Sequence, residues 1–148
     1  MKRSIYRERL LEVISPIHKH YTLRTYTKVT RKLNSLRSSL RKRSKDNNVD
    51  FNITQAELIE KFIECYGQQC KYCTNILTYK IMVMDHIVPI TKGGPSTPEN
   101  LHFICKRCNT IKGPLTESDF MLLMITVGKF TEELHVYTMR KLSKGGRY

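Results

Sequence analysis

Two Cys-x-x-Cys pairs limit the fold of this chain more than any other feature of its sequence. Cys70 and Cys73 form the first pair, Cys105 and Cys108 form the second, and 31 residues separate the pairs. A two-residue gap lets both thiolates of a pair reach one ion from a tight turn, so two such turns predict a tetrahedral zinc site with four cysteine ligands. Because sulfur would fill all four ligand positions, the ion is expected to be structural rather than catalytic. A substantial segment must then lie between the ligand pairs.

Disulfide or redox chemistry is the alternative interpretation of these cysteines. Zinc is favoured because both pairs are flanked by basic residues, and because disulfides are rare in cytosolic chains. The fifth cysteine, Cys65, falls on a predicted helix and is interpreted as a small buried apolar residue.

Positive charge is concentrated towards the two ends of the chain. The 148 residues include 26 Lys and Arg against 13 Asp and Glu, a formal net charge of +13. Residues 1–50 carry a net charge of +10 and residues 139–148 carry +4, whereas residues 51–138 carry −1. Such a surface attracts a polyanion, and a nucleic-acid backbone is the commonest polyanion in a cell. The alternative is a pair of basic segments that only aid solubility or bind RNA loosely.

Membrane, secreted and disordered classes fit the composition poorly. No stretch approaches the ~18 consecutive apolar residues of a membrane span, and residues 1–8 are charged where a signal peptide would be apolar. The hydrophobic content of 40% is too high for a wholly disordered chain. The sequence predicts a cytoplasmic protein, in a bacterial or phage-infected cell, with no membrane partner.

Helices are predicted before the cysteine segment. A short helix should end before Pro16, because the residue that precedes a proline avoids helical angles. Apolar residues at every third or fourth position then predict a helix over residues 25–45. Thr54 followed by Glu57 has the pattern of a capping box, which opens a helix expected to end at Gly67.

The basic residues of the 25–45 helix fall largely off its apolar stripe. This helix could dock by its leucines and present cations to phosphates, or it could have a solvated basic face. The candidate nucleic-acid contacts on it are Arg31, Lys32, Arg41 and Lys42.

The cysteine segment and the C-terminal part predict shorter elements. Residues 81–84 are typical of a strand, and Gly93-Gly94-Pro95 is typical of a turn. Helical segments are predicted over residues 109–112, 116–125 and 131–142.

Several further residues stand in a recognisable order around the second half of the cysteine segment. They are Asp85-His86-Ile87-x-Pro89, Gly93-Gly94, Asn100-Leu101 and, directly after Cys108, Asn109-x-x-Lys112-Gly113. Together with the two cysteine pairs, this pattern resembles the zinc-containing HNH nuclease family over residues 70–113. The resemblance implies a small ββα-metal core stapled by the four-cysteine zinc site. With the α-helices that periodicity predicts at both ends, the expected fold class is α+β.

The charge distribution and the predicted elements divide the chain into three parts. Residues 1–50 would form a basic helical arm that contacts DNA. Residues 51–115 would form the zinc-bound nuclease core with its leading helix. Residues 116–148 would form the C-terminal helices and a basic tail.

The resemblance assigns a role to each of four residues. His86 would be the general base that takes a proton from the attacking water. Asp85 would be a ligand of one catalytic Mg²⁺ or Mn²⁺, and Asn109, where the family has His or Asn, would be its second ligand. Asn100 would brace the loop that holds His86.

The chemistry of these residue types is consistent with those roles. Imidazole, with an unperturbed pKa of ~6.5, suits proton abstraction near neutrality. A carboxylate and an amide oxygen are hard ligands that suit Mg²⁺ or Mn²⁺. Because neighbouring strand residues point to opposite faces, Asp85 and His86 can serve one phosphate only if the backbone bends at the strand end.

Two residues near the motif leave alternatives open. Lys112 could contact a phosphate or be a solvated lysine. His102 could point at the site or pack against it, and packing is favoured.

The leading hypothesis is a metal-dependent HNH-type endonuclease that hydrolyses DNA phosphodiester bonds. The DNA would be duplex or branched, and the protein a monomer or homodimer. The alternative is a non-catalytic, zinc-stabilised nucleic-acid-binding protein, which would have no need of Asp85, His86 and Asn109.

Overall fold

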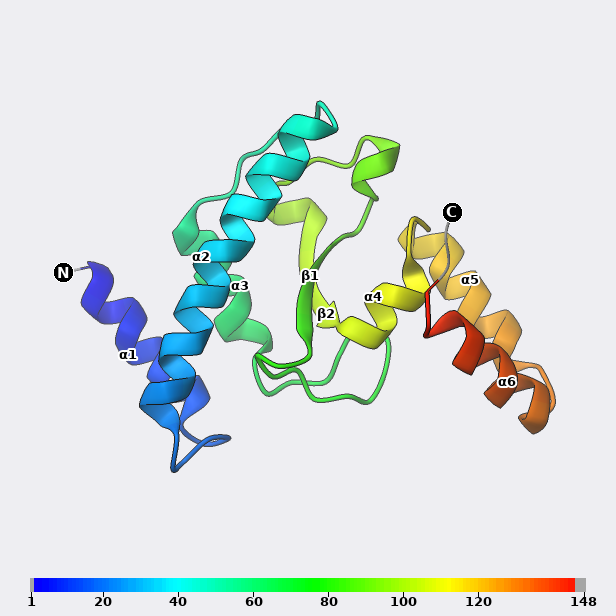
Figure 1. The fold of residues 1–148 in the computed structure, drawn as a ribbon, viewed down its shortest axis with the longest axis horizontal. Coiled ribbons are helices and arrows are strands. Elements are labelled where there is room, and N and C mark those ends of the chain that lie inside the picture. The colour runs from blue at the N-terminus through cyan, green and yellow to red at the C-terminus, as the bar shows by residue number, and fades with distance from the viewer. Residues whose placement is uncertain (1, 146–148) are drawn as a thin grey trace.

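A two-stranded antiparallel sheet lies at the centre of the molecule, with helices on both sides (Figure 1). This arrangement comes from a computed structural model, which describes residues 2–145. The elements before the sheet are α1 (Lys2–Ile14), α2 (Thr22–Asp46) and α3 (Gln55–Cys65). The central elements are β1 (Met82–His86), the 3-10 turns η1 (Ile90–Lys92) and η2 (Pro98–Asn100), β2 (Leu101–Cys105) and α4 (Lys106–Lys112). The hairpin of α5 (Glu117–Gly128) and α6 (Glu132–Leu142) follows.

The sheet and α4 form the ββα unit. β1 pairs with β2 so that Met82 lies opposite Cys105 and His86 lies opposite Leu101. The expected α+β class, with a ββα-metal core and helices on both sides, is therefore confirmed. β1 is longer than the predicted strand over residues 81–84, because the pairing continues through His86.

β2 was missing from the sequence-based prediction. Its five residues alternate between the two faces of the sheet, and four of them are buried. A single strand leaves its backbone groups unpaired, so the predicted β1 already required a partner. The apolar run directly after Asn100 was the signal that could have identified it.

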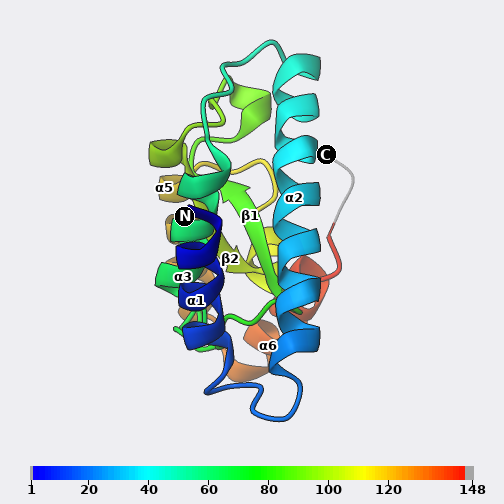
Figure 2. The ribbon, with the colours of Figure 1, turned by 90° about the vertical axis from the view of Figure 1, so that its left-hand side faces the viewer.

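The three N-terminal helices share one apolar core with the sheet. Leu33 and Leu40 of α2 are buried in it, and the ring of Phe62 on α3 packs edge-on against Phe103 of β2 with 5.8 Å between centroids. Helix α2 begins at Thr22, three residues before the predicted start. Figure 2 shows α2 running alongside β1. The boundaries predicted at residues 50 and 115 stay a prediction.

Local sequence signals set the ends of α3. Thr54 and Glu57 form the predicted capping box, in which each side chain bonds the other residue's backbone N–H. The helix ends at Cys65, and Gly67 follows with a left-handed φ of 79°. This backbone angle favours glycine, and an added Cβ would also lie 2.8 Å from the end of the Ile17 side chain.

The α5–α6 hairpin has a small core of its own on the far side of α4 (Figure 1). That core consists of Ile111, Phe120, Val127 and Met139. The hairpin is joined to the first cysteine pair, because Tyr72 donates a 2.6 Å hydrogen bond to Glu117 at the start of α5. None of the helices within residues 2–145 combines the length and apolar composition needed to cross a bilayer.

Candidate metal centre and active site

The four paired cysteines converge at one end of the hairpin formed by β1 and β2. Their Sγ atoms all lie within 4.8 Å of one another, and all four thiols are free of disulfides. The Sγ atoms of Cys73 and Cys105 are 3.6 Å apart. Because a tetrahedral ion with Zn–S bonds of ~2.3 Å requires sulfur atoms about 3.8 Å apart, the cluster is positioned for a zinc site.

Backbone and amide donors surround the sulfur atoms. Cys105 N lies 3.4 Å from Cys70 Sγ, and Cys108 N lies 3.4 Å from Cys105 Sγ. The Asn75 amide adds a third donor, 3.7 Å from Cys105 Sγ. Burial opposes ionisation of Cys105, but the Cys108 N–H and the Asn75 amide stabilise its thiolate and lower its pKa to about 7. Donors of this kind orient and stabilise metal-bound thiolates.

Cys65 lies outside this cluster. It is half-buried on α3, and its Sγ is 3.0 Å from Lys61 O. Burial raises the pKa of this thiol to about 12, so it stays protonated at neutral pH. It packs against the core, as a small apolar residue would.

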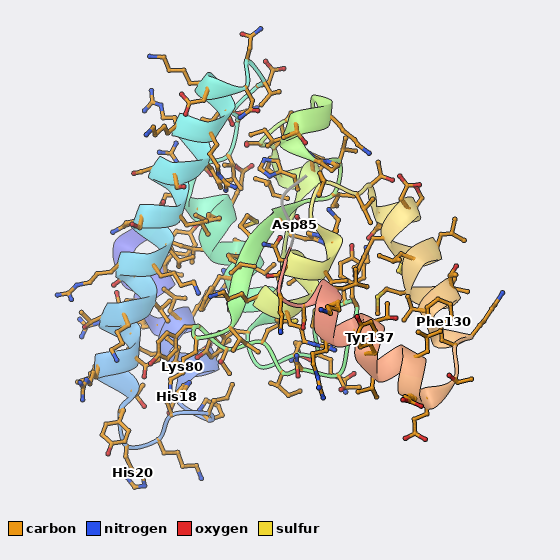
Figure 3. The ribbon with its side chains drawn as sticks, turned by 45° about the vertical axis from the view of Figure 1, so that its right-hand side comes forward. His18, His20, Lys80, Asp85, Phe130 and Tyr137 are labelled. Atoms are coloured by element: carbon orange, nitrogen blue, oxygen red, sulfur yellow. The ribbon has the colours of Figure 1, made fainter. Side chains whose placement is uncertain are left out.

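The Asp85 carboxylate is buried and held by two cationic or polar side chains. Its Oδ2 atom lies 3.0 Å from Lys112 Nζ and 3.0 Å from His102 Nε2. In Figure 3, Asp85 lies between the N-terminal helices and the α5–α6 hairpin, whereas His18 and His20 lie in the loop that joins α1 to α2. The predicted metal ligand is therefore an interior group.

The sequence left open whether His102 points at the site or packs against it. It stands directly opposite Asp85 in the sheet, and its ring meets Tyr72 edge-on with 5.8 Å between centroids. The side chain thus both packs and reaches the Asp85 carboxylate.

His86 ends β1 and is also buried. Its Nε2 lies 2.9 Å from Ser96 Oγ, which in turn accepts a 2.7 Å hydrogen bond from Ser44 Oγ on α2. Burial, followed by the positive charge of Arg43, lowers the pKa of His86 to about 4, while the Asp85 charge acts in the opposite direction. The imidazole is therefore neutral at pH 7.

The side chains of Asp85 and His86 point to opposite faces of β1, because successive strand residues alternate and the pairing is regular through His86. The chain bends at Ile87 and Val88, directly after the strand, so this bend does not bring the Asp85 and His86 side chains to one face. Lys112 spans the two residues, since its ammonium also donates a 2.9 Å hydrogen bond to the main-chain oxygen of His86.

Asn100 ties together the loop that follows His86. Its side chain accepts a 2.8 Å bond from Val88 N and donates to the carbonyls of Val88 and Pro95. Its main-chain oxygen accepts from Ile87 N. The chain passes so close at Gly94 that an added Cβ would lie 1.8 Å from Val88 O. These contacts support the bracing role implied for Asn100.

Asn109 lies on α4, one turn before Lys112. It lines an open groove of about 500 Å³ between α2, β1 and α4. The other residues along the groove are Lys32, Ser35, Leu36, Ser39, Arg43, Val83 and Met84.

Two of the predicted nucleic-acid contacts have internal partners instead. The Lys112 side chain is fully buried against Asp85 and His86, so the expectation of a phosphate contact is wrong, and so is that of a solvated lysine. The Lys32 ammonium donates to Tyr79 O at 2.5 Å and Met82 O at 2.6 Å, which fastens α2 to β1. Burial lowers the pKa of Lys32. Sequence spacing could not show these contacts, because their partners lie at least 26 residues away.

Arg31, Arg41 and Lys42 are exposed on α2. Arg41 and Lys42 line a second groove, of about 600 Å³, together with Lys45 near the end of the helix. These three predicted residues remain candidates for contact with a polyanion.

Comparison with known proteins finds matches for the segment that contains the cysteine cluster, Asp85, His86 and Asn109. Residues 70–115 match the profile described as HNH endonuclease. This segment is therefore similar to the HNH endonuclease family, and the match covers less than half of the chain. A 46-residue stretch of the chain is also 48% identical to the CRISPR-associated endonuclease Cas9 of Corynebacterium diphtheriae. That stretch is 30% of this chain and only 4% of the Cas9 length, so the likeness concerns the HNH segment alone.

Proposed function

We propose that the HNH segment makes this protein a metal-dependent endonuclease that hydrolyses DNA phosphodiester bonds. The observation that carries the proposal is a neutral imidazole at the end of β1, on His86, next to the buried carboxylate of Asp85 in a segment of a nuclease family. Phosphodiester hydrolysis needs a base for water and a cation for the phosphate charge. This pair of residues can supply the first and bind the second.

The cluster of four cysteines would hold a structural Zn²⁺. Four sulfur atoms within 4.8 Å, with N–H donors directed at two of them, fit this ion and leave no open ligand position. The zinc would join the segment before β1 to the turn between β2 and α4. It would thereby fix the hairpin that carries Asp85 and His86.

Asp85 and Asn109 would hold one Mg²⁺ or Mn²⁺. Their carboxylate and amide oxygens are hard donors that fit these cations. Oδ2 of Asp85 already has two partners, which favours Oδ1 as the oxygen for the cation. When bound, such a cation neutralises charge that grows on the phosphate and on the leaving 3′ oxygen.

His86 would take the proton from the attacking water. Its Nε2 faces Ser96 Oγ, so Nδ1 is the ring nitrogen assigned to this step. Ser96 Oγ has two lone pairs and can accept from both Ser44 and His86, which would place the imidazole lone pair on Nδ1. Asn100 would hold the loop after His86 in place, through its bonds to Val88 and Pro95.

The exposed cations of α2 would supply binding energy for the DNA backbone. Arg31, Arg41 and Lys42 are the residues proposed for these contacts, which give affinity but little sequence discrimination.

A plasmid-cleavage assay tests the proposed function. Zinc-loaded protein is expected to convert supercoiled plasmid to nicked or linear DNA with Mg²⁺ or Mn²⁺ and not with EDTA. His86→Ala should reduce the rate by about 10²–10⁴-fold, the usual contribution of a general base. His135→Ala, on α6, is the matched control and should cleave like the wild type. Equal rates for His86→Ala and wild type would refute the assignment of the base.

A zinc-stabilised binding protein without catalysis is the second candidate. It is favoured by the burial of His86, which is 4% exposed, and by the ion pair that already occupies Asp85. It predicts salt-sensitive DNA binding with no metal-dependent cutting of supercoiled, single-stranded or branched DNA. The same cleavage assay therefore separates the two candidates.

A further inference from the structure

The groove that contains Asn109 also contains an arginine to which the proposed mechanism gives no role. We propose that Arg43 binds the scissile phosphate, so that the groove between α2, β1 and α4 is where the cleaved strand lies. This inference rests on the proposed endonuclease function and adds one residue that would contact the substrate.

The first observation is an unsatisfied donor. Arg43 is half-buried near the end of α2, and its Nε is buried without a hydrogen-bond partner. Among the residues that the structure describes, no other buried side-chain nitrogen or oxygen lacks a partner. A buried donor of a charged group is costly to leave unpaired, and an anion in the groove would remove that cost.

The second observation is the position of the side chain. Arg43 lines the groove together with Asn109, the proposed cation ligand on α4. The next residue along α2, Ser44, donates a hydrogen bond to Ser96 Oγ, which also contacts Nε2 of His86, the proposed base at the end of β1. Arg43 therefore lines the groove with the proposed cation ligand and adjoins the residue that leads to the proposed base.

The third observation is that the other nearby cations already have partners within the protein. Lys32 lines the same groove, but its ammonium is bound to two carbonyl oxygens at the edge of β1. Lys112 is bound to Asp85 and to His86 O. Of these three cations, only Arg43 has a buried nitrogen without any hydrogen-bond partner.

The chemistry of the guanidinium suits this task. It is planar, keeps its charge at all relevant pH values, and donates two parallel hydrogen bonds to phosphate oxygens. Donors directed at oxygens that gain charge in the transition state lower the barrier more than they tighten ground-state binding. We therefore expect Arg43 to affect the rate of the cleavage step more than the affinity for DNA.

Arg43→Ala tests the inference, with Arg24→Ala as the matched control. Both residues lie on α2, about 28 Å apart along the helix axis at 1.5 Å per residue. Single-turnover cleavage at saturating protein gives the rate of the bound step, and binding of the same duplex in Ca²⁺ gives the dissociation constant. Arg43→Ala should slow the bound step by about 10²–10³-fold, as removal of one such donor does. The dissociation constant should change by less than about fivefold, and Arg24→Ala should change neither value.

Two further measurements separate contact with phosphate from a role in folding. Added guanidinium ion at low millimolar concentration should partly restore cleavage by Arg43→Ala and should not affect Arg24→Ala. The melting temperature of Arg43→Ala should stay near that of the wild type. If it falls, Arg43→Gln, which keeps the polar stem, should still show the slow bound step and the guanidinium rescue.

Contrary outcomes point to different failures. If the wild type cleaves DNA and Arg43→Ala cleaves at the same rate, the inference about Arg43 is wrong. It is also wrong if the variant binds more weakly but has an unchanged bound step, since Arg43 would then be an affinity contact. If the wild type itself cleaves nothing with any divalent cation, the proposed function fails instead.

Discussion

The two ends of the hairpin formed by β1 and β2 are built in different ways. At the end where Met82 faces Cys105, four sulfur atoms point at one centre and N–H donors surround them. At the end where His86 faces Leu101, the neighbouring carboxylate of Asp85 is held on Oδ2 only, by the side chains of Lys112 and His102.

The difference separates a closed site from an open one. A structural metal has all its ligand positions filled by protein, and a catalytic metal keeps a position for substrate or water. The sulfur end corresponds to the first description. The other end corresponds to the second, because Lys112 and His102 contact only Oδ2 of the Asp85 carboxylate, and Asn109, the other proposed ligand, lines a groove of about 500 Å³. Substitutions at one end at a time test whether the two ends differ in this way.

Cys108→Ser should have the largest effect, because it removes one ligand from the closed end. Structural zinc contributes folding free energy of ~10 kcal/mol or more, which is comparable with the whole stability of a domain. We expect the variant to lose its zinc and its cooperative thermal transition, measured by metal analysis and by melting. Cys65→Ser, the same change outside the cluster, should melt close to the wild type. A transition that survives both Cys108→Ser and strong chelation would contradict the zinc assignment.

Lys112→Met should have the next largest effect, because it breaks the ion pair at the open end. The side chains of Lys112 and Asp85 are 0% and 10% exposed, so the variant leaves a carboxylate buried without its cation. Removing one partner of a buried pair costs about 3–5 kcal/mol. Urea unfolding measures the loss, and Lys106→Met, on the exposed side of α4, is the control. A loss below about 1 kcal/mol would show that His102 and water satisfy Asp85 on their own.

Gly94→Ala should have a smaller effect on stability, confined to the loop of the open end. The new Cβ would lie 1.8 Å from Val88 O and 2.9 Å from the Asn100 amide nitrogen, so the loop must shift. We expect a loss of about 1–3 kcal/mol, measured by urea unfolding, and slower cleavage. Gly128→Ala, whose Cβ would meet nothing within 4 Å, is the control and should be close to neutral. Equal stability for the two variants would show that the loop is not held as tightly as its contacts indicate.

Alkylation of Cys65 should have the smallest effect on the protein, since this thiol belongs to neither end of the hairpin. Its rate instead tests the burial of the thiol. With a pKa of about 12, its thiolate fraction grows about tenfold for each pH unit between pH 7 and 10. The rate of reaction with iodoacetamide, measured on zinc-loaded protein by mass spectrometry, should rise in the same way without a plateau. The denatured chain, whose thiols titrate near ~8.5, provides the comparison. A plateau near pH 9 in the folded protein would contradict the burial of this thiol.

The closed end of the hairpin could be predicted from the sequence, because its chemistry is local. The two-residue gaps in Cys70-x-x-Cys73 and Cys105-x-x-Cys108 indicate a shared ion without knowledge of the fold. The capping box at Thr54 was predictable for the same reason. The β2 strand could also have been predicted, since β1 required a partner strand.

The open end could be predicted only in part. The Asp85-His86 pair and Asn109 were identified from the family pattern, but the pairing stays regular through His86, so the two side chains keep opposite faces of β1. The partners of Lys32 and Lys112 depend on tertiary contacts over long sequence separations, so charge spacing alone did not identify them. His102 was ambiguous until the strand register placed it opposite Asp85.

Anomalous X-ray scattering from crystals soaked in Mn²⁺ tests the central claim that one hairpin holds two different ions at its ends. We predict a zinc signal surrounded by the four Sγ atoms of the cysteine pairs, and a manganese signal bound to the oxygens of Asp85 and Asn109. Manganese bound elsewhere, or a sulfur cluster without zinc, would contradict the claim.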